Sequence, residues 1–179
     1  MTTTTTDDAV QVPGIGRYAI DNQGSTVAFR SRHLFGLALV RGTMAISHGL
    51  VDVADPITDS SVHAEIDTTS FDTGSRQRDG DVRSARFLGA DRYPSMTFTS
   101  ARLDRSDGRW TLAGALTVRD VARPVSLAIE QSTVQPGTPN SFVVCATTRI
   151  DRTEFGLTAA RWMAGRDLDV SLRILGVRR

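Results

Sequence analysis

The chain has 179 residues, with 21 basic and 20 acidic side chains, a net charge of +1 and 40% hydrophobic residues. This length and composition fit one soluble globular domain, and the balanced charge gives no electrostatic reason to expect nucleic acid or an anionic membrane as a partner. All 21 basic residues are arginine, which excludes a Schiff-base lysine and a P-loop lysine.

The first 14 residues are rich in threonine and acidic residues and end in Pro-Gly. This composition predicts a flexible tail (1–14), followed by a single domain over residues 15–179. The tail lacks the basic start and the apolar run of a secretory signal. No stretch approaches the roughly 20 apolar residues of a membrane span. We therefore expect a cytoplasmic protein without stable membrane insertion.

From Tyr18 onward, apolar and polar residues alternate with a period of two in many short runs, each with one apolar face. This pattern is typical of half-buried β-strands. The runs cover residues 25–35, 40–46, 61–67, 96–103, 110–119, 124–130, 142–150 and 168–176. At least eight strands with no repeated helical crossover predict an all-β antiparallel barrel or sandwich.

Two segments break the alternation. Residues 73–88 are highly charged, and Val82, Ala85 and Leu88 recur at a spacing of three. This spacing predicts a short helix on the surface of the barrel or over its mouth. Residues 154–165 are predicted to form a loop with local hairpin character.

Composition alone does not decide whether the interior is filled or hollow. Several residues on the apolar faces are small and would leave room: Gly42, Ala64, Gly114 and Ala146. Bulky neighbours would close the same space: Phe29, Phe98 and Trp110. Both interpretations stay open at this point.

The titratable residues do not form a recognisable catalytic or metal-binding pattern. His33 lies on the apolar face of the first long run, where a hydrogen-bonded core histidine competes with one that meets a polar group of a ligand. His48 is placed in a turn and His63 on a polar face, so no metal site is expected. Cys145, the only cysteine, is expected to be a small buried side chain. No nucleophile elbow or nucleotide loop is present, so we expect no cofactor.

Six ordered groups of residues resemble the YceI-like family of bacterial barrel proteins. They are residues 16–29 (GRYAID and STVAF), 32–43 (RHLFG and VRGT), 72–88 (DTG, RD, RS and RFL), 93–98 (YPSMTF), 114–125 (GALTVRDVARPV) and 151–157 (DRTEFGL). Together they cover nearly the whole chain after the tail.

The resemblance implies an eight-stranded antiparallel lipocalin-like β-barrel with a short helix near one end. It also implies a long apolar interior that binds a polyisoprenoid or an isoprenoid quinone, and it permits a homodimer. The family carries no general set of catalytic residues, so a binding protein is expected rather than an enzyme. The candidate ligand-contacting residues are Phe29, His33, Phe35, Met44, Phe98, Leu116, Trp162 and Arg78.

Three alternatives stay open. Arg78 and Asp79 could form a structural ion pair that seats the helix, or Arg78 could face the barrel mouth and contact a phosphate or carbonyl head group. The barrel could instead be an enzyme that cyclises or isomerises an apolar polyene by positioning it. It could also be filled with side chains and act through its surface.

Overall fold

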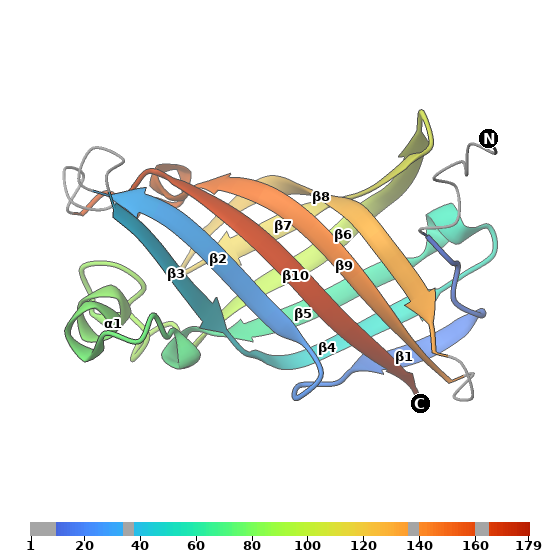
Figure 1. The fold of residues 1–179 in the computed structure, drawn as a ribbon, viewed down its shortest axis with the longest axis horizontal. Helices are drawn as coiled ribbons and strands as arrows, with labels where there is room; N and C mark the ends of the chain where they lie inside the picture. Colours follow the sequence, from blue (N-terminus) through green and yellow to red (C-terminus); the bar gives the residue numbers. More distant parts are fainter. Residues whose placement is uncertain (1–9, 34–37, 136–139, 160–164) are drawn as a thin grey trace, which may run out of the picture.

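The computed structural model describes residues 10–33, 38–135, 140–159 and 165–179. Within these residues the chain forms ten strands and one short α-helix (Figure 1). The strands are β1 (Gly16–Ile20), β2 (Thr26–His33), β3 (Ala38–Met44), β4 (Ile46–Val53), β5 (Ser61–Asp67), β6 (Ser95–Ser106), β7 (Arg109–Val118), β8 (Val121–Val134), β9 (Ser141–Asp151) and β10 (Asp167–Arg178). The helix is α1 (Arg76–Arg83).

The strands close into an eight-stranded antiparallel barrel, as predicted. Two positions of the barrel are each shared by a pair of consecutive strands. Strands β1 and β2 both pair with the same edge of β10, through Ile20 opposite Gly176 and Thr26 opposite Arg173. Strand β3 pairs with β2, and β4, which follows after Ala45, pairs with β1 and β5.

The alternation in the sequence correctly predicts which strand side chains face the interior of the barrel. In all eight predicted runs, apolar residues from the expected face line the interior. Strands β1 and β4 were not predicted as separate strands, and the placement of His48 in a turn was wrong, because His48 lies in β4. A β-bulge shifts the register between Ile46, opposite Ile66, and His48, opposite Glu65. The bulge breaks the period-two pattern by which a strand is recognised.

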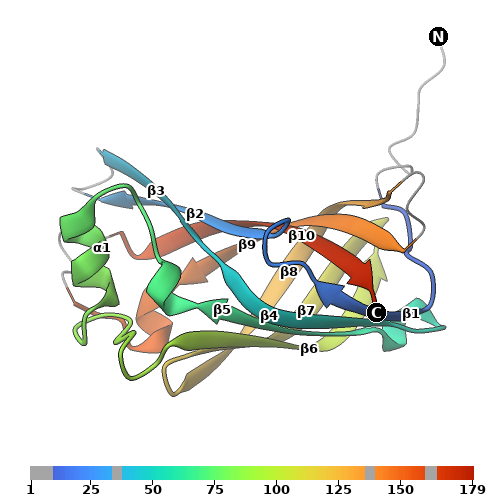
Figure 2. The ribbon, with the colours of Figure 1, turned by 90° about the horizontal axis from the view of Figure 1, so that it is seen from below.

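The end of the barrel nearest α1 is covered by the segment that joins β5 to β6. This segment contains the 3-10 turn η3 (Thr68–Ser70) and α1, and Figure 2 shows it across the end, between β3 and the β5–β6 pair. The helix predicted within residues 73–88 is therefore confirmed. Its N-cap is Ser75, whose hydroxyl accepts the Arg78 backbone N–H.

A short segment of the N-terminal region contacts the opposite end of the barrel. Val10 forms a parallel bridge with Ser132. The backbone N–H of Gln11 donates to the Ser132 carbonyl at 2.8 Å, and the Ser132 hydroxyl donates to the Gln11 carbonyl at 2.7 Å. Val10 and Gln11 thus have specific partners on β8. A flexible tail over residues 1–9, which lie outside the described chain, stays a prediction.

On each of two inward-facing glycines, an aromatic ring from the neighbouring strand is packed. An added Cβ on Gly42 would collide with the ring of Phe29, and one on Gly114 would come within 2.6 Å of the ring of Phe98. Each ring therefore occupies the space that a side chain on the glycine would fill. Such packing lets large apolar side chains lie along the barrel wall instead of crossing the interior.

The predicted loop at residues 154–165 begins as the 3-10 turn η4 (Arg152–Phe155). Asp151 caps this turn, because its Oδ1 accepts the Thr153 backbone N–H at 2.9 Å and the Thr153 hydroxyl at 2.6 Å. Its Oδ2 also accepts the Arg166 Nε at 2.6 Å. The Thr153 and Arg166 contacts stabilise the carboxylate and lower the pKa of Asp151.

Replacing Gly114 by alanine should lower the free energy of unfolding by about 1–3 kcal/mol, because the new Cβ would lie 2.5 Å from the Thr99 carbonyl oxygen. Gly80→Ala is the control: this helical glycine has nothing within 4 Å of the added Cβ, so the change should stabilise by about 0.5–1 kcal/mol. Urea denaturation measures both. Equal effects of the two substitutions would contradict the close packing around Gly114.

Asp151→Asn should destabilise the fold at pH 7, and the difference from wild type should shrink as the pH falls below about 4. The folded-state pKa of Asp151 is lowered, so its stabilisation is present above the unfolded pKa and is lost as the pH falls through the folded one. Urea midpoints measured between pH 7 and acid test this. In the control Asp104→Asn, the lost pair with Arg102 is exposed at the surface and should matter little at any pH. A difference that does not change with pH would rule out this role for Asp151.

Candidate functional site

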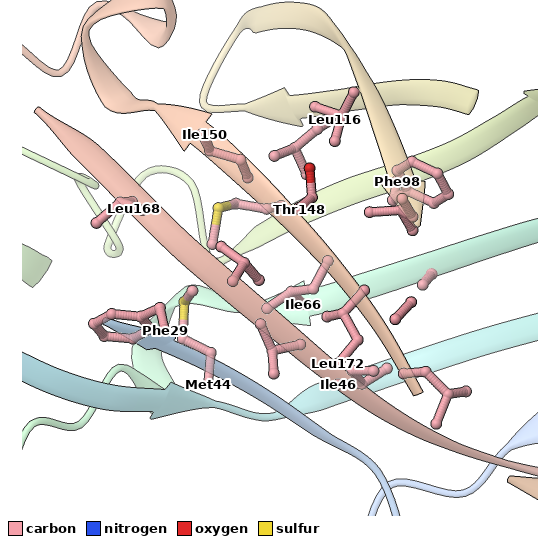
Figure 3. Close-up of a pocket in the computed structure, with 18 of the residues that line it drawn as sticks. Phe29, Met44, Ile46, Ile66, Phe98, Leu116, Thr148, Ile150, Leu168 and Leu172 are labelled. Atoms are coloured by element: carbon pink, nitrogen blue, oxygen red, sulfur yellow. The ribbon is translucent and has the colours of Figure 1, made fainter. Parts of the chain in front are cut away.

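The barrel encloses a cavity of about 700 Å³. Every strand of the barrel contributes to its wall, which also includes residues 10–13 at one end and α1 at the other. The side chains along the strands are almost all apolar, as the close-up in Figure 3 shows. The volume lies within the 300–1,000 Å³ range of small-molecule sites. The barrel is therefore hollow, and the alternative of an interior filled with side chains is wrong.

Four of the predicted contact residues lie together on this wall, namely Phe29, Met44, Phe98 and Leu116. They come from β2, β3, β6 and β7, and Figure 3 shows them around the same space. The pairing of the strands places these side chains on the inner face. Phe29 lies opposite Gly42 in the β2–β3 pair, and Phe98 lies opposite Leu116 in the β6–β7 pair.

Three other predicted contact residues cannot be placed at the cavity. His33 is the last residue of β2, but its side chain, together with Phe35 and Trp162, lies outside the described part of the chain. A role for these residues in ligand contact stays a prediction.

Several residues of the cavity wall were not predicted from the sequence, because they come from connecting segments. Phe71 follows η3 and stacks on Phe29 with ring centroids 5.0 Å apart. Phe87 follows α1, and Val10 and Val12 come from the segment assigned to the tail. No periodicity marks these positions, since each becomes part of the wall through the path of a loop. The apolar spacing of Val82 and Leu88 was the one available signal.

Arg78 reaches the cavity from α1. Its Nε donates to the Thr73 hydroxyl at 2.8 Å, and that hydroxyl donates to Oδ1 of Asp79 at 2.6 Å. Arg78 and Asp79 are thus linked through Thr73, and the direct ion pair considered from the sequence is not observed. Among the described residues, no carboxylate lies within 4 Å of the Arg78 guanidinium.

Polar contacts seat α1 on the barrel. Asp79 is 5% exposed, and its carboxylate also accepts the Thr73 backbone N–H at 3.0 Å. Arg83 donates to the Asp79 carbonyl at 3.1 Å and to the Thr69 carbonyl at 3.2 Å. A negative charge in the first turn also interacts favourably with the helix dipole. These contacts hold α1, and with it Arg78, at the end of the cavity.

Arg152 supports the same end of the barrel from η4. This side chain is 6% exposed, and its guanidinium donates to the carbonyls of Gly165, Leu157 and Ala159. It also lies over the ring of Phe87, 5.9 Å from the centroid. These contacts tie the loop after η4 to the segment that follows α1.

The composition of the cavity wall suits an apolar molecule. The described part of its wall carries one carboxylate, Asp81, and neither histidine nor cysteine. In the same described ranges, no three His, Cys, Asp or Glu side chains converge to bind a metal ion. None of the helices there is long and apolar enough to cross a membrane.

Comparison with known proteins identifies relatives over most of the chain. Residues 18–175 match the YceI-like domain model. The YceI protein of Shigella flexneri is 38% identical over 114 residues, which cover 62% of this chain and 59% of that protein. A UPF0312 protein of Vibrio campbellii is 32% identical over 117 residues, covering 63% of this chain and 61% of that protein. The matches thus span less than two thirds of these relatives.

Solved structures share the fold at low sequence identity. BcnA of Burkholderia cenocepacia superposes with a TM-score of 0.76 at 20% identity, covering 87% of this chain and 98% of that structure. A polyisoprenoid-binding domain from Saccharophagus degradans gives 0.69 at 14% identity, covering 90% and 98%. With the family match over most of the barrel, these findings establish that the chain belongs to the YceI-like domain family.

Proposed function

We propose that this protein binds a long apolar lipid of the polyisoprenoid or isoprenoid-quinone type inside its barrel and sequesters or carries it. The observation that carries the proposal is the hollow interior of about 700 Å³ with an almost wholly apolar wall. Each methylene that leaves water contributes about 0.8 kcal/mol. A long chain therefore gains binding energy without directional contacts, and discrimination among similar tails should be weak.

Two further observations support this class of ligand. The Saccharophagus degradans protein with the same fold is a polyisoprenoid-binding domain. The cavity also runs between segments at opposite ends of the barrel, residues 10–13 and α1, so its shape suits an extended chain better than a compact molecule.

Arg78 supports a head group at the α1 end. Thr73 holds its Nε, while no carboxylate of the described chain lies within 4 Å of its guanidinium. A guanidinium forms strong paired hydrogen bonds with phosphate or carboxylate oxygens. We therefore propose that the tail lies in the barrel and that an anionic head group, where the lipid has one, meets Arg78.

The wider setting of this function stays a prediction. A cytoplasmic location and the absence of catalysis are expected from the sequence and the family resemblance, and the resemblance permits a homodimer. Turnover of a polyene in the same cavity, by cyclisation or isomerisation, is the competing hypothesis, and no contact described above favours it.

Protein purified without added lipid should carry an apolar molecule that native mass spectrometry detects as extra mass. Leu116→Trp should abolish this mass or reduce lipid binding at least about tenfold, because the indole would project into the cavity. The control is Ala115→Trp, since Ala115 lies next to Leu116 on β7 and is exposed on the outer face. No bound mass in wild type, together with no saturable binding on lipid titration, would overturn the proposed function.

Arg78→Gln should weaken binding of a polyisoprenyl phosphate by about tenfold or more, because a hydrogen-bonded charge pair is lost. Binding of the polyisoprenol of equal length should change little. Arg76→Gln is the control, because Arg76 lies exposed on the same helix and does not line the cavity. Dissociation constants for both lipids with each variant measure the effect. An equal loss for phosphate and alcohol would exclude Arg78 as the head-group contact.

A further inference from the structure

A threonine hydroxyl faces the apolar cavity and has no hydrogen-bond partner among the residues that the structure describes. Thr148 lies on β9, where Ala146 and Ile150 on either side also face inward, and it is paired across the sheet with Val170 of β10. Figure 3 shows its side chain among the apolar residues of the wall, with the oxygen in red. Within the part of the chain that the structure describes, no hydrogen bond joins this hydroxyl to another protein group.

The other hydroxyls on the described wall all have structural partners. Ser31 donates to the Asp167 carbonyl at 3.2 Å, and Ser132 donates to the Gln11 carbonyl at 2.7 Å. Ser60 accepts the Ala54 backbone N–H at 3.0 Å, and Ser75 caps α1. Each of these hydroxyls completes a turn, a cap or a strand contact. The Thr148 hydroxyl has no such structural role, so the fold does not explain why this position carries a hydroxyl.

Valine would serve the barrel equally well at this position. Threonine and valine have nearly the same shape and similar preference for strands, and differ in that one methyl is replaced by a hydroxyl. Val170, opposite Thr148 on β10, and Val144, two inward positions away on β9, show that valine fits this part of the wall. A hydroxyl covered by an apolar ligand and left unpaired costs free energy. Thr148 would therefore oppose a pure hydrocarbon and favour a ligand that offers an oxygen.

The position of Thr148 limits where that oxygen lies. Thr148 is three residues before the end of β9 at Asp151, which places it about 10 Å inside the α1 end of the barrel. Arg78 contacts the cavity from that same end. The oxygen therefore lies in the part of the ligand nearest its head, deeper than a group at the mouth, while the tail extends toward residues 10–13.

We infer that Thr148 is a specificity-determining residue that hydrogen-bonds a neutral oxygen of the bound lipid. The ligand class is an apolar chain that carries a hydroxyl, carbonyl or ether oxygen near its head. A threonine hydroxyl both donates and accepts, so it can pair with each of these groups. This inference rests on the proposed lipid-binding function and adds to it a preference that the apolar wall alone would not give.

The test compares two ligands that differ by one hydroxyl, phytol and phytene. The full chain is delipidated, and the dissociation constant of each ligand is measured by competition against a fluorescent apolar probe. Thr148→Val should raise the ratio of the phytol constant to the phytene constant by about 3- to 10-fold relative to wild type. Thr148→Ser, which keeps the hydroxyl and removes the methyl group, should leave this ratio within about twofold.

The possible results separate the two proposals. A phytol-to-phytene ratio that is the same in Thr148→Val and wild type would overturn the role of Thr148 and leave lipid binding intact. A ratio that shifts equally in Thr148→Val and Thr148→Ser would also overturn it, because the cause would then be packing and not the hydroxyl. Failure of wild type to bind either ligand would overturn the proposed function, and this inference with it.

Discussion

Phenylalanine rings packed against inward-facing glycines keep the barrel apolar without filling it. Phe29 covers Gly42 and Phe98 covers Gly114, and Phe142 lies against Gly176 in the same way. The wall thus buries large apolar surfaces, which stabilise the barrel. Because the rings take the place of missing side chains on the wall, the centre stays open. A closed eight-stranded barrel has an interior that is either packed or just wide enough for one small ligand, and these pairs favour the second outcome.

Short segments line the two ends of the cavity, and they differ in chemistry. At one end, Val10 and Gln11 lie against Ser132 through neutral backbone and hydroxyl contacts. At the other, α1 is held through Thr73 and Asp79, and it brings the charged side chains of Arg78 and Asp81 to the wall. This difference gives the cavity a direction. An amphipathic lipid should therefore orient with its tail toward residues 10–13 and its head toward α1.

Much of the fold could be predicted from the sequence because strand side chains alternate with a fixed period. That period placed Phe29, Met44, Phe98 and Leu116 on the inner face, where the structure has them. It failed at β4, where a bulge after Ile46 interrupts the alternation and left His48 assigned to a turn. The helix was predicted from the apolar spacing within residues 73–88, whereas the closed barrel was expected from the family resemblance, since alternation alone is equally consistent with a sandwich.

The polar features of the site could not be derived in the same way. The partner of the Arg78 guanidinium depends on how residues 72–79 fold. Arg78 and Asp79 are linked through the Thr73 hydroxyl, and the direct ion pair considered from the sequence is not observed. The contribution of Phe71 and of residues 10–13 to the wall likewise depends on the paths of connecting segments. That the Thr148 hydroxyl has no hydrogen-bond partner in the described chain can likewise be established only when its neighbours in space are known.

Whether an apolar chain lies along the barrel axis can be decided by locating such a chain in a crystal. A crystal of the delipidated protein soaked with a terminally brominated isoprenoid would reveal the bromine by anomalous scattering. We expect one peak inside the barrel, at the end near residues 10–13, with the polar head toward Arg78. A bromine peak only on the outer surface, or a cavity that holds ordered water after soaking, would contradict it.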